Sequence, residues 1–277
     1  MYRVLALLPF VALAFSFNGA RAADELFPDK NLEAVVRQYV FEKRNNTMPL
    51  VEADVQSLST IQGKGKKIAS LAGLEKCKSL ALLDLENNEI VDLAPIKDLK
   101  QIQSLNLAKN KIVSIAPLAD LIAIQYLELT GNQIVELSPL VKIAALRNLY
   151  AADNQIKDIS PLAQCPKIYS LYLENNPVQD FKPLASLKDL ERVGLDNTGI
   201  SDLSPLVGLT EWKFLFLKNN KITDLAPLVE MAKKDFAGQK RFAPFWRVYL
   251  AGNPLSDDAK TKQAEELKKY GTRLELQ

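Results

Sequence analysis

The feature that most constrains this chain is a sequence pattern that returns every 22 residues. From Leu80 the frame reads apolar-x-x-apolar-x-apolar-x-x-Asn-x-apolar and continues to a Pro-Leu or Pro-Ile step. The asparagine position is occupied by Asn88, Asn110, Asn132, Asn154, Asn176 and Asn220, with Thr198 in one unit and Asn253 in a last unit that follows after 33 residues. Such a period is typical of a solenoid, because one unit cannot bury its apolar side chains alone and stacked units share a core.

Within one unit, each residue type suits its place in a coil. Ile124, Leu127 and Leu129 alternate with outward positions, as in a short strand with one buried face. Asn132 follows the strand, where its amide can hydrogen-bond to backbone groups of the turn. Pro139 then begins a helical turn, because its fixed φ and missing N–H suit a first turn. We therefore predict an α/β solenoid with a curved parallel sheet on the concave side and short 3-10 or helical turns on the convex side.

The frame also extends beyond its regular part. A degenerate unit precedes Leu80, with Lys66 in the asparagine position, and a last unit opens with Phe245 as its expected first core residue. The 11 extra residues before that last unit predict an inserted helix near residues 229–242. In all, we predict about nine coils over residues 58–255.

The open ends of a solenoid expose core, so caps are expected. Asp29 is placed to cap the first helix of a helical N-terminal cap over residues 23–57. A C-terminal cap helix is predicted within residues 256–277, from Ser256 through Tyr270, with Gly271 positioned to end it and a final strand expected over residues 272–276. The coils and both caps are expected to form one domain.

The first residues predict export. Arg3 precedes an apolar run over residues 4–17, and Ala20-Arg21-Ala22 has the small-x-small form of a cleavage site. The run is shorter than the roughly 20 residues that span a bilayer, so residues 1–22 are predicted to be a signal peptide rather than an uncleaved anchor. We expect a periplasmic or secreted protein with no membrane span after cleavage.

Charge and histidine content exclude several classes of function. The chain has 35 basic and 33 acidic side chains, and loss of Arg3 and Arg21 with the signal peptide would leave 33 of each. That balance does not attract nucleic acid or an anionic membrane. The absence of histidine removes Ser-His and Cys-His nucleophiles and histidine metal ligands. We therefore expect a protein that is not an enzyme, with no cofactor and no metal.

One pair of carboxylates suggests an enzyme. Glu174 and Asp196 lie in the same column on adjacent coils, about 5 Å apart, which is near the carboxyl separation of retaining glycosidases. Lys218 continues that column, so a simple charge ladder is the favoured interpretation.

The two cysteines are expected to be free. Cys77 and Cys165 occupy equivalent positions four repeats apart, which corresponds to about 19 Å at the spacing of stacked strands. A disulfide requires Cα atoms within about 7 Å. We predict two buried, unpaired thiols on the convex side.

One family shares this frame. The line Leu83-x-Leu85-x-x-Asn88-x-Ile90-x-Asp92-Leu93-x-Pro95-Ile96 resembles the internalin type of bacterial leucine-rich repeat. The segment Leu26-Phe27-Pro28-Asp29 resembles the helical N-terminal cap of that family. The resemblance implies a curved protein-recognition solenoid on or outside a bacterial cell. The immunoglobulin-like domain of internalins has no counterpart in this sequence, so host-cell adhesion is not part of the expectation.

The concave sheet is where a partner is expected to bind. The third, fifth and seventh positions of each unit point away from the core, and aromatic rings gather there in the C-terminal half. The candidate binding residues are Tyr126, Glu128, Tyr150, Tyr172, Glu174, Arg192, Gly194, Phe214, Phe216, Lys218, Arg247 and Tyr249. Exposed rings beside arginines and acids are typical of a binding hot spot. Gly194 lies between Tyr172 and Phe216, so a notch is predicted between the two rings.

Three interpretations of this surface stay open. The favoured one is recognition of a protein partner by a monomeric scaffold. The second is glycan binding, with Tyr150, Tyr172 and Phe216 as stacking platforms. In the third, the rings pack on each other and only stabilise the sheet, so that the solenoid is a spacer.

Overall fold

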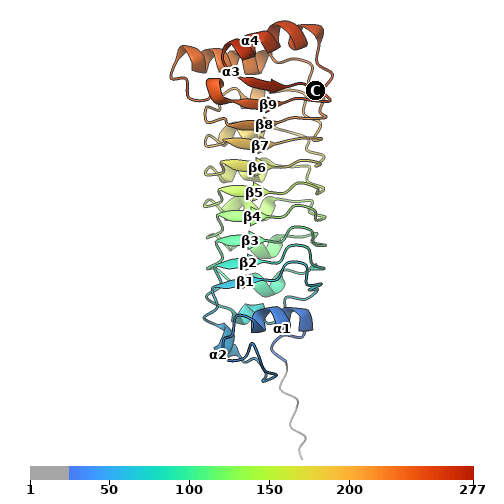
Figure 1. Ribbon diagram of the computed structural model, residues 1–277, viewed down its shortest axis with the longest axis vertical. Coiled ribbons are helices and arrows are strands. Elements are labelled where there is room, and N and C mark those ends of the chain that lie inside the picture. Colours follow the sequence, from blue (N-terminus) through green and yellow to red (C-terminus); the bar gives the residue numbers. More distant parts are fainter. Residues whose placement is uncertain (1–24) are drawn as a thin grey trace, which may run out of the picture.

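Within residues 25–277, ten parallel strands stacked in chain order form an open sheet (Figure 1). The computed structural model describes residues 25–277, so the predicted signal peptide over residues 1–22 lies outside the described residues. The strands are β1 Thr60–Gln62, β2 Leu82–Asp84, β3 Ser104–Asn106, β4 Tyr126–Glu128, β5 Asn148–Tyr150, β6 Ser170–Tyr172, β7 Arg192–Gly194, β8 Phe214–Phe216, β9 Arg247–Tyr249 and β10 Arg273–Glu275. Equivalent residues of successive repeats pair across the sheet, as Leu105 does with Leu127. The repeat period is therefore the strand register.

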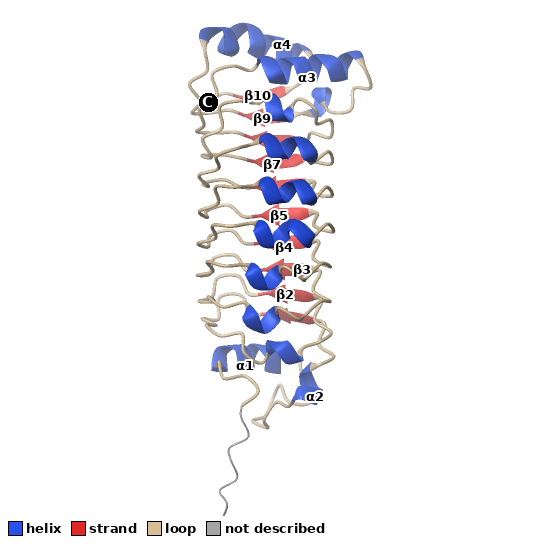
Figure 2. Cartoon of the chain, turned by 180° about the vertical axis from the view of Figure 1, so that it is seen from behind, coloured by secondary structure: helices blue, strands red, loops and turns tan. Residues whose placement is uncertain are grey.

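Short helical turns return the chain on the side opposite the sheet (Figure 2). The 3-10 turns are η1 Leu74–Lys76, η2 Ala94–Ile96, η3 Ala116–Leu118, η4 Ser138–Lys142, η5 Ser160–Gln164, η6 Lys182–Ser186, η7 Ser204–Leu206 and η8 Ala243–Phe245. From η2 onward a proline occupies the first or second position of each turn, where its missing N–H has no helical partner to lose. The predicted solenoid of strands and short turns is confirmed.

One continuous apolar core runs through all coils. The central residue of each inner strand points inward, and Leu83, Leu105, Leu127 and Leu149 are fully buried. Each of these leucines packs against its equivalents in the coils above and below, so no coil has a core of its own.

The last coil departs from the predicted frame. Phe245 was expected in the core, but its side chain is 71% exposed, whereas Trp246 is fully buried. Trp246 stacks on Trp212 with ring centroids 5.9 Å apart, and Phe242 meets it edge-on at 5.3 Å. The indole buries more apolar surface than a phenyl ring, which explains why the larger ring lies inside.

A ladder of asparagine side chains joins neighbouring coils. The Nδ2 atom of Asn132 donates to the carbonyl oxygens of Leu107 at 3.0 Å and Leu129 at 2.9 Å. Its Oδ1 atom accepts from the backbone N–H of Ile112 at 3.0 Å. The other ladder residues are Asn88, Asn110, Asn154, Asn176, Asn220 and Asn253, and each donates both to its own coil or turn and to the coil before it. These bonds satisfy backbone groups that the turns leave inside the molecule.

Thr198 interrupts that ladder. Its hydroxyl donates to the carbonyl oxygen of Leu195, in its own coil, at 2.7 Å. Within residues 25–277 it makes no bond to the preceding coil, because a hydroxyl is shorter than an amide and carries one hydrogen rather than two.

Helical segments cover both ends of the stack (Figure 1). The first end has α1 Lys30–Arg37 and α2 Glu52–Val55. The other end has α3 Ala226–Ala237, which is the inserted helix, followed after β9 by a π-helical turn Ala259–Gln263 and α4 Ala264–Lys269. Strand β10 then returns to pair with β9, so the sheet continues beyond the last helix. None of the helices in residues 25–277 is long and apolar enough to cross a bilayer.

Asp29 attaches the first helix to the first coil. Its Oδ1 atom accepts the N–H groups of Asn31 and Leu32 in α1, which confirms the predicted cap, and its Oδ2 atom accepts those of Ala69 and Ser70 at 2.7 and 3.0 Å. Burial opposes ionisation of this carboxyl, but the four N–H donors outweigh it, and the pKa of Asp29 lies below its usual value.

We expect Asp29→Ala to lower the free energy of unfolding by about 2 kcal/mol, because a lost helix cap alone costs about 1 kcal/mol and two further N–H donors lose their acceptor. Urea unfolding followed by circular dichroism would measure the loss. The matched control is Asp98→Ala, since Asp98 is exposed and makes no hydrogen bond within the described residues. Equal losses in the two variants would contradict the role given to Asp29.

Both cysteines are buried and free. Burial raises the pKa of the Cys77 thiol to about 12 and that of the Cys165 thiol to about 11. The Sγ atom of Cys165 donates to the carbonyl oxygen of Leu140 at 3.4 Å. Both thiols therefore act as small apolar groups of the core.

Candidate binding surface

The sheet face is the surface formed by the outward first and third residues of strands β2 to β10, together with the residues that follow each strand. In most strands these positions are partly exposed while the residue between them is buried. All twelve predicted binding residues lie on this face, because the register of the parallel strands brings equivalent positions of successive coils side by side.

Five rings on the sheet face form a continuous aromatic ladder, consisting of Tyr126, Tyr150, Tyr172, Phe216 and Tyr249. The centroids of consecutive rings are 5.5, 5.1, 6.2 and 4.6 Å apart. Tyr150 and Tyr172 are nearly parallel, at 10°, and so are Phe216 and Tyr249, at 14°. Each ring is partly buried, and each packs against at least one neighbouring ring of the ladder.

The notch predicted at Gly194 is wrong. The ring centroids of Tyr172 and Phe216 are 6.2 Å apart, whereas two strand spacings would place the rings about 9.6 Å apart. The two rings therefore lean toward each other. The carboxylate of Glu174 covers what remains of the space, and Gly194 itself is buried. A Cβ atom at Gly194 would lie 2.6 Å from Cδ1 of Tyr172, so glycine here allows the ring and the carboxylate to pack.

Glu174 is the most unusual ionisable group of the sheet face. Its Oε2 atom is buried and has no hydrogen-bond partner within the described residues. Burial raises the pKa of Glu174 to about 7, and the charges of Asp196 and Asp153 act in the same direction. Glu128 lies farther down the same face, and burial raises the pKa of that carboxyl as well.

The predicted charge ladder does not form as a row of ion pairs. Asp196 accepts the backbone N–H of Lys218 at 2.7 Å, and burial raises the pKa of Asp196. The ammonium group of Lys218 lies 5.4 Å from the centroid of the Tyr249 ring, in a cation–π arrangement. The ammonium group of Lys218 therefore contacts an aromatic ring rather than a carboxylate of this column.

Arginines border the aromatic ladder at the start of β7, β9 and β10. The first residues of β7 to β10 are Arg192, Phe214, Arg247 and Arg273. The guanidinium carbon of Arg192 lies 6.0 Å from the Phe214 ring centroid, and that of Arg247 lies 5.6 Å from it. One ring thus packs between two cations, with a third cation on the next strand.

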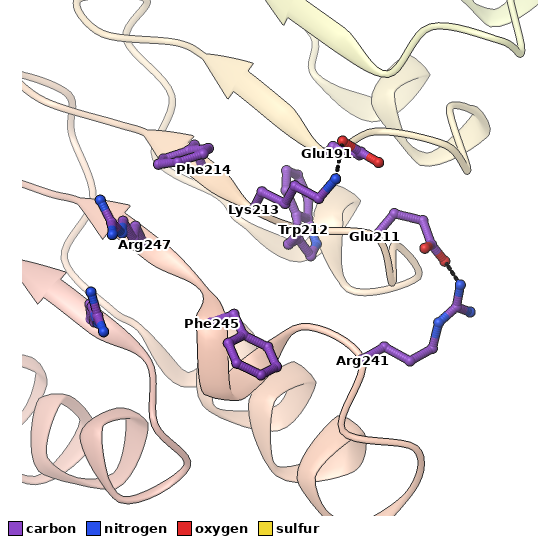
Figure 3. Close-up of a pocket in the computed structure, with 9 residues that line it drawn as sticks. Glu191, Glu211, Trp212, Lys213, Phe214, Arg241, Phe245 and Arg247 are labelled. Atoms are coloured by element: carbon purple, nitrogen blue, oxygen red, sulfur yellow. Dashed lines mark hydrogen bonds and ion pairs between the residues drawn. The ribbon is translucent and has the colours of Figure 1, made fainter.

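An open pocket of about 650 Å³ lies beside these arginines (Figure 3). Its lining residues are Glu191, Glu211, Trp212, Lys213, Phe214, Arg241, Phe245, Arg247 and Arg273. We call it the arginine pocket. Lys213 pairs with Glu191 at 2.7 Å, and Arg241 pairs with Glu211.

Of the nine lining residues, sequence reasoning had named only Phe214 and Arg247 as binding residues. Phe245 had been assigned to the core, and Arg273 lies in the final strand expected over residues 272–276, which was not included in the candidate binding surface. The sequence does contain a signal that places Arg273 on the sheet face, because Arg273-Leu274-Glu275 has the same outward-apolar-outward order as Arg247-Val248-Tyr249.

Comparisons with known proteins agree with this architecture. The family described as "Leucine rich repeat" matches residues 78–134, and "Leucine Rich repeats (2 copies)" matches residues 145–186. An internalin (inlF) from Listeria monocytogenes is 27% identical, with a TM-score of 0.70, and the match covers 91% of this chain and 77% of that one. Internalin C2 from the same organism is also 27% identical, with a TM-score of 0.63 and coverage of 91% and 95%.

A more distant structure shows the fold alone. It is the ectodomain of the plant receptor kinase GASSHO1/SCHENGEN3 from Arabidopsis thaliana, solved in complex with CASPARIAN STRIP INTEGRITY FACTOR 2. It is 19% identical, with a TM-score of 0.55, and the match covers 68% of this chain and 23% of that one. A search of curated proteins finds no match to this chain.

The fold and the repeat matches define the chain as a leucine-rich repeat protein, a class that typically consists of non-catalytic binding scaffolds. Within that class its fold is similar to that of the two Listeria internalins.

Proposed function

We propose that this chain is an exported, monomeric, non-catalytic scaffold that binds another protein through its sheet face. The observation that carries the proposal is the aromatic ladder with arginines along its border. Tyrosine and arginine are the residue types most enriched at binding hot spots. Related folds bind protein ligands, as the plant ectodomain does with the factor named in its complex. Export is supported by the signal-peptide pattern of residues 1–22.

The ladder favours a protein over a glycan. A sugar ring stacks on the flat face of an aromatic ring, and such a face must be open. Tyr150 and Tyr172 turn their faces toward each other, as do Phe216 and Tyr249. The partly exposed rings, with the hydroxyl groups of the tyrosines, suit hydrogen bonds and apolar contacts with a protein surface.

Binding rather than catalysis also fits the ionisable groups of this face. Glu174 has a raised pKa, as a general acid often has, but the second carboxyl, Asp196, is held by a backbone N–H. The chain has no histidine to act as a base.

The test is affinity capture from periplasmic and envelope extract, followed by binding measurements with the purified captured protein. We expect the Tyr150→Ala/Tyr172→Ala/Phe216→Ala variant to bind at least about tenfold more weakly than wild type, since one hot-spot side chain contributes about 2 kcal/mol. Circular dichroism would confirm that the variant is folded.

The matched control is Phe41→Ala/Ile122→Ala, which removes two side chains that are 76% and 58% exposed and lie off the sheet face. It should bind as wild type does. Equal binding by all three proteins would exclude the sheet face as the docking surface. Binding of envelope oligosaccharides that is lost only in the ladder variant would favour the glycan alternative.

A further inference from the structure

Two arginines on neighbouring strands lie side by side without a carboxylate. Arg247 and Arg273 are paired in the register of β9 and β10, so their Cα atoms are separated by about one strand spacing, 4.8 Å. Both side chains are exposed, and within residues 25–277 neither comes within ion-pair distance of an acidic group. Glu275 is on the same strand as Arg273 but does not pair with it. Like charges directly opposite each other on a sheet are destabilising, so the fold gains nothing from this pair.

The rest of the arginine pocket is already neutralised. Lys213 is held by Glu191 and Arg241 by Glu211, so each of these cations has its own carboxylate. The positive charge that remains in the pocket belongs to Arg247 and Arg273. A ligand that neutralises it would be an anion that both guanidinium groups can reach.

Besides the buried Trp212, two rings give the pocket an apolar component. Phe214 packs under the guanidinium group of Arg247 and holds it against the sheet. Phe245 lies on the other side of the pocket and is 71% exposed (Figure 3). An exposed phenyl ring next to unpaired cations suits a ligand with an apolar group beside its negative charge.

We infer that the arginine pocket binds a side-chain or terminal carboxylate of the partner protein, in an acidic segment whose neighbouring apolar side chain packs on Phe245. The inference rests on the proposed function and specifies the chemistry of the partner. A carboxylate accepts two parallel N–H bonds from a guanidinium group, and two adjacent arginines offer several such donors. Inorganic phosphate has no apolar part to pack on the exposed ring of Phe245, whereas a carboxylate in a peptide can have an apolar side chain beside it.

The test uses a fluorescent peptide, Gly-Asp-Phe-Glu-Phe-Asp-Gly, and its amide counterpart, Gly-Asn-Phe-Gln-Phe-Asn-Gly. Wild type should bind the acidic peptide at least about tenfold more tightly in fluorescence anisotropy, because charge-assisted bonds to guanidinium groups contribute about 1.5–3 kcal/mol. The variant R247Q/R273Q should lose that preference. Its thermal midpoint should equal or exceed that of wild type, since the substitution relieves a like-charge contact.

The matched control is K213Q/R241Q, which removes the same charge from the same pocket but at the two cations that are already paired. We expect it to keep most of the preference for the acidic peptide. Equal losses in the two double variants would show that only net charge matters and would overturn the inference. Equal binding of the two peptides by wild type would overturn it as well, and so would inorganic phosphate that displaces the peptide at lower concentration than acetate does.

The outcome can be separated from that of the proposed function. Suppose that R247Q/R273Q binds the captured partner as tightly as wild type, while the triple alanine variant of the aromatic ladder no longer binds it. The inference then fails and the proposed function stands. Suppose instead that the triple alanine variant of the aromatic ladder still binds the partner, and that only R247Q/R273Q fails to bind both the partner and the acidic peptide. The inference about the arginine pocket then stands, and docking on the aromatic ladder is excluded.

Discussion

Asn132→Ala is expected to lower the free energy of unfolding by about 4 kcal/mol. The substitution leaves the carbonyl oxygens of Leu107 and Leu129 and the N–H of Ile112 without their side-chain partner. Asn132 is 8% exposed, so water reaches these groups poorly. Each buried polar group left unsatisfied costs about 1–3 kcal/mol. Urea unfolding followed by circular dichroism would measure the change.

The control for this prediction is a second asparagine in a neighbouring coil. Asn148 lies on the sheet face, and its side chain makes no hydrogen bond within the described residues. Asn148→Ala should change stability by no more than about 0.5 kcal/mol, as is usual for surface substitutions. If Asn132→Ala lowered the free energy of unfolding only as little as the control does, the structural role of the asparagine ladder would be contradicted.

Glu174→Gln is expected to stabilise the protein at pH 8 and to leave its stability unchanged near pH 4. Burial raises the folded-state pKa of Glu174 from 4.5 to about 7, so the folded protein favours the neutral acid. The stability that Glu174 contributes is therefore fully present below about pH 4.5 and is lost as the pH rises through 7. Glutamine cannot ionise and should avoid that loss.

The size of this effect follows from the shift. One pKa unit corresponds to about 1.4 kcal/mol, so the difference between variant and wild type at pH 8 is on the order of 3 kcal/mol. For a chain of this size that is a rise of roughly 6–12 °C in Tm. Thermal unfolding at both pH values would measure it, and an NMR titration of the Glu174 carboxyl carbon would locate its pKa directly.

Glu86→Gln provides a control of opposite sign. The hydrogen bond from Lys64 lowers the pKa of Glu86, so its contribution to stability is present above the unfolded pKa and lost in acid. The glutamine variant should therefore be less stable than wild type at pH 8. A gain in both variants would show that any lost negative charge stabilises the protein, and the specific account of Glu174 would fall.

The sheet face therefore combines features that cost stability with features that provide it. The stacked rings stabilise the sheet through cross-strand contacts. The buried, unpartnered oxygen of Glu174 and the adjacent Arg247 and Arg273 do the opposite. Groups that weaken the fold and lie on one accessible face are expected where a surface serves recognition, because a partner can supply the missing bonds.

The sequence alone was enough to predict the architecture of this protein. For β1 to β8, strand positions, strand order and register all follow from the 22-residue period, because residues one period apart, such as Leu105 and Leu127, occupy the same place in neighbouring coils. The asparagine positions, the prolines of the turns and the helix cap at Asp29 could be predicted for the same reason, since each depends on backbone geometry within one or two coils.

The tertiary structure alone decided how the side chains of the sheet face meet. The closing of Tyr172 and Phe216 over Gly194 depends on rotamers chosen by contacts between three strands, which a repeat pattern does not encode. The burial of Trp246 in place of Phe245 depends on which ring fits against Trp212. The arginine pocket exists because β10 returns to the sheet after α4 and sets Arg273 beside Arg247, a pairing made by long-range contacts rather than by neighbours in the chain.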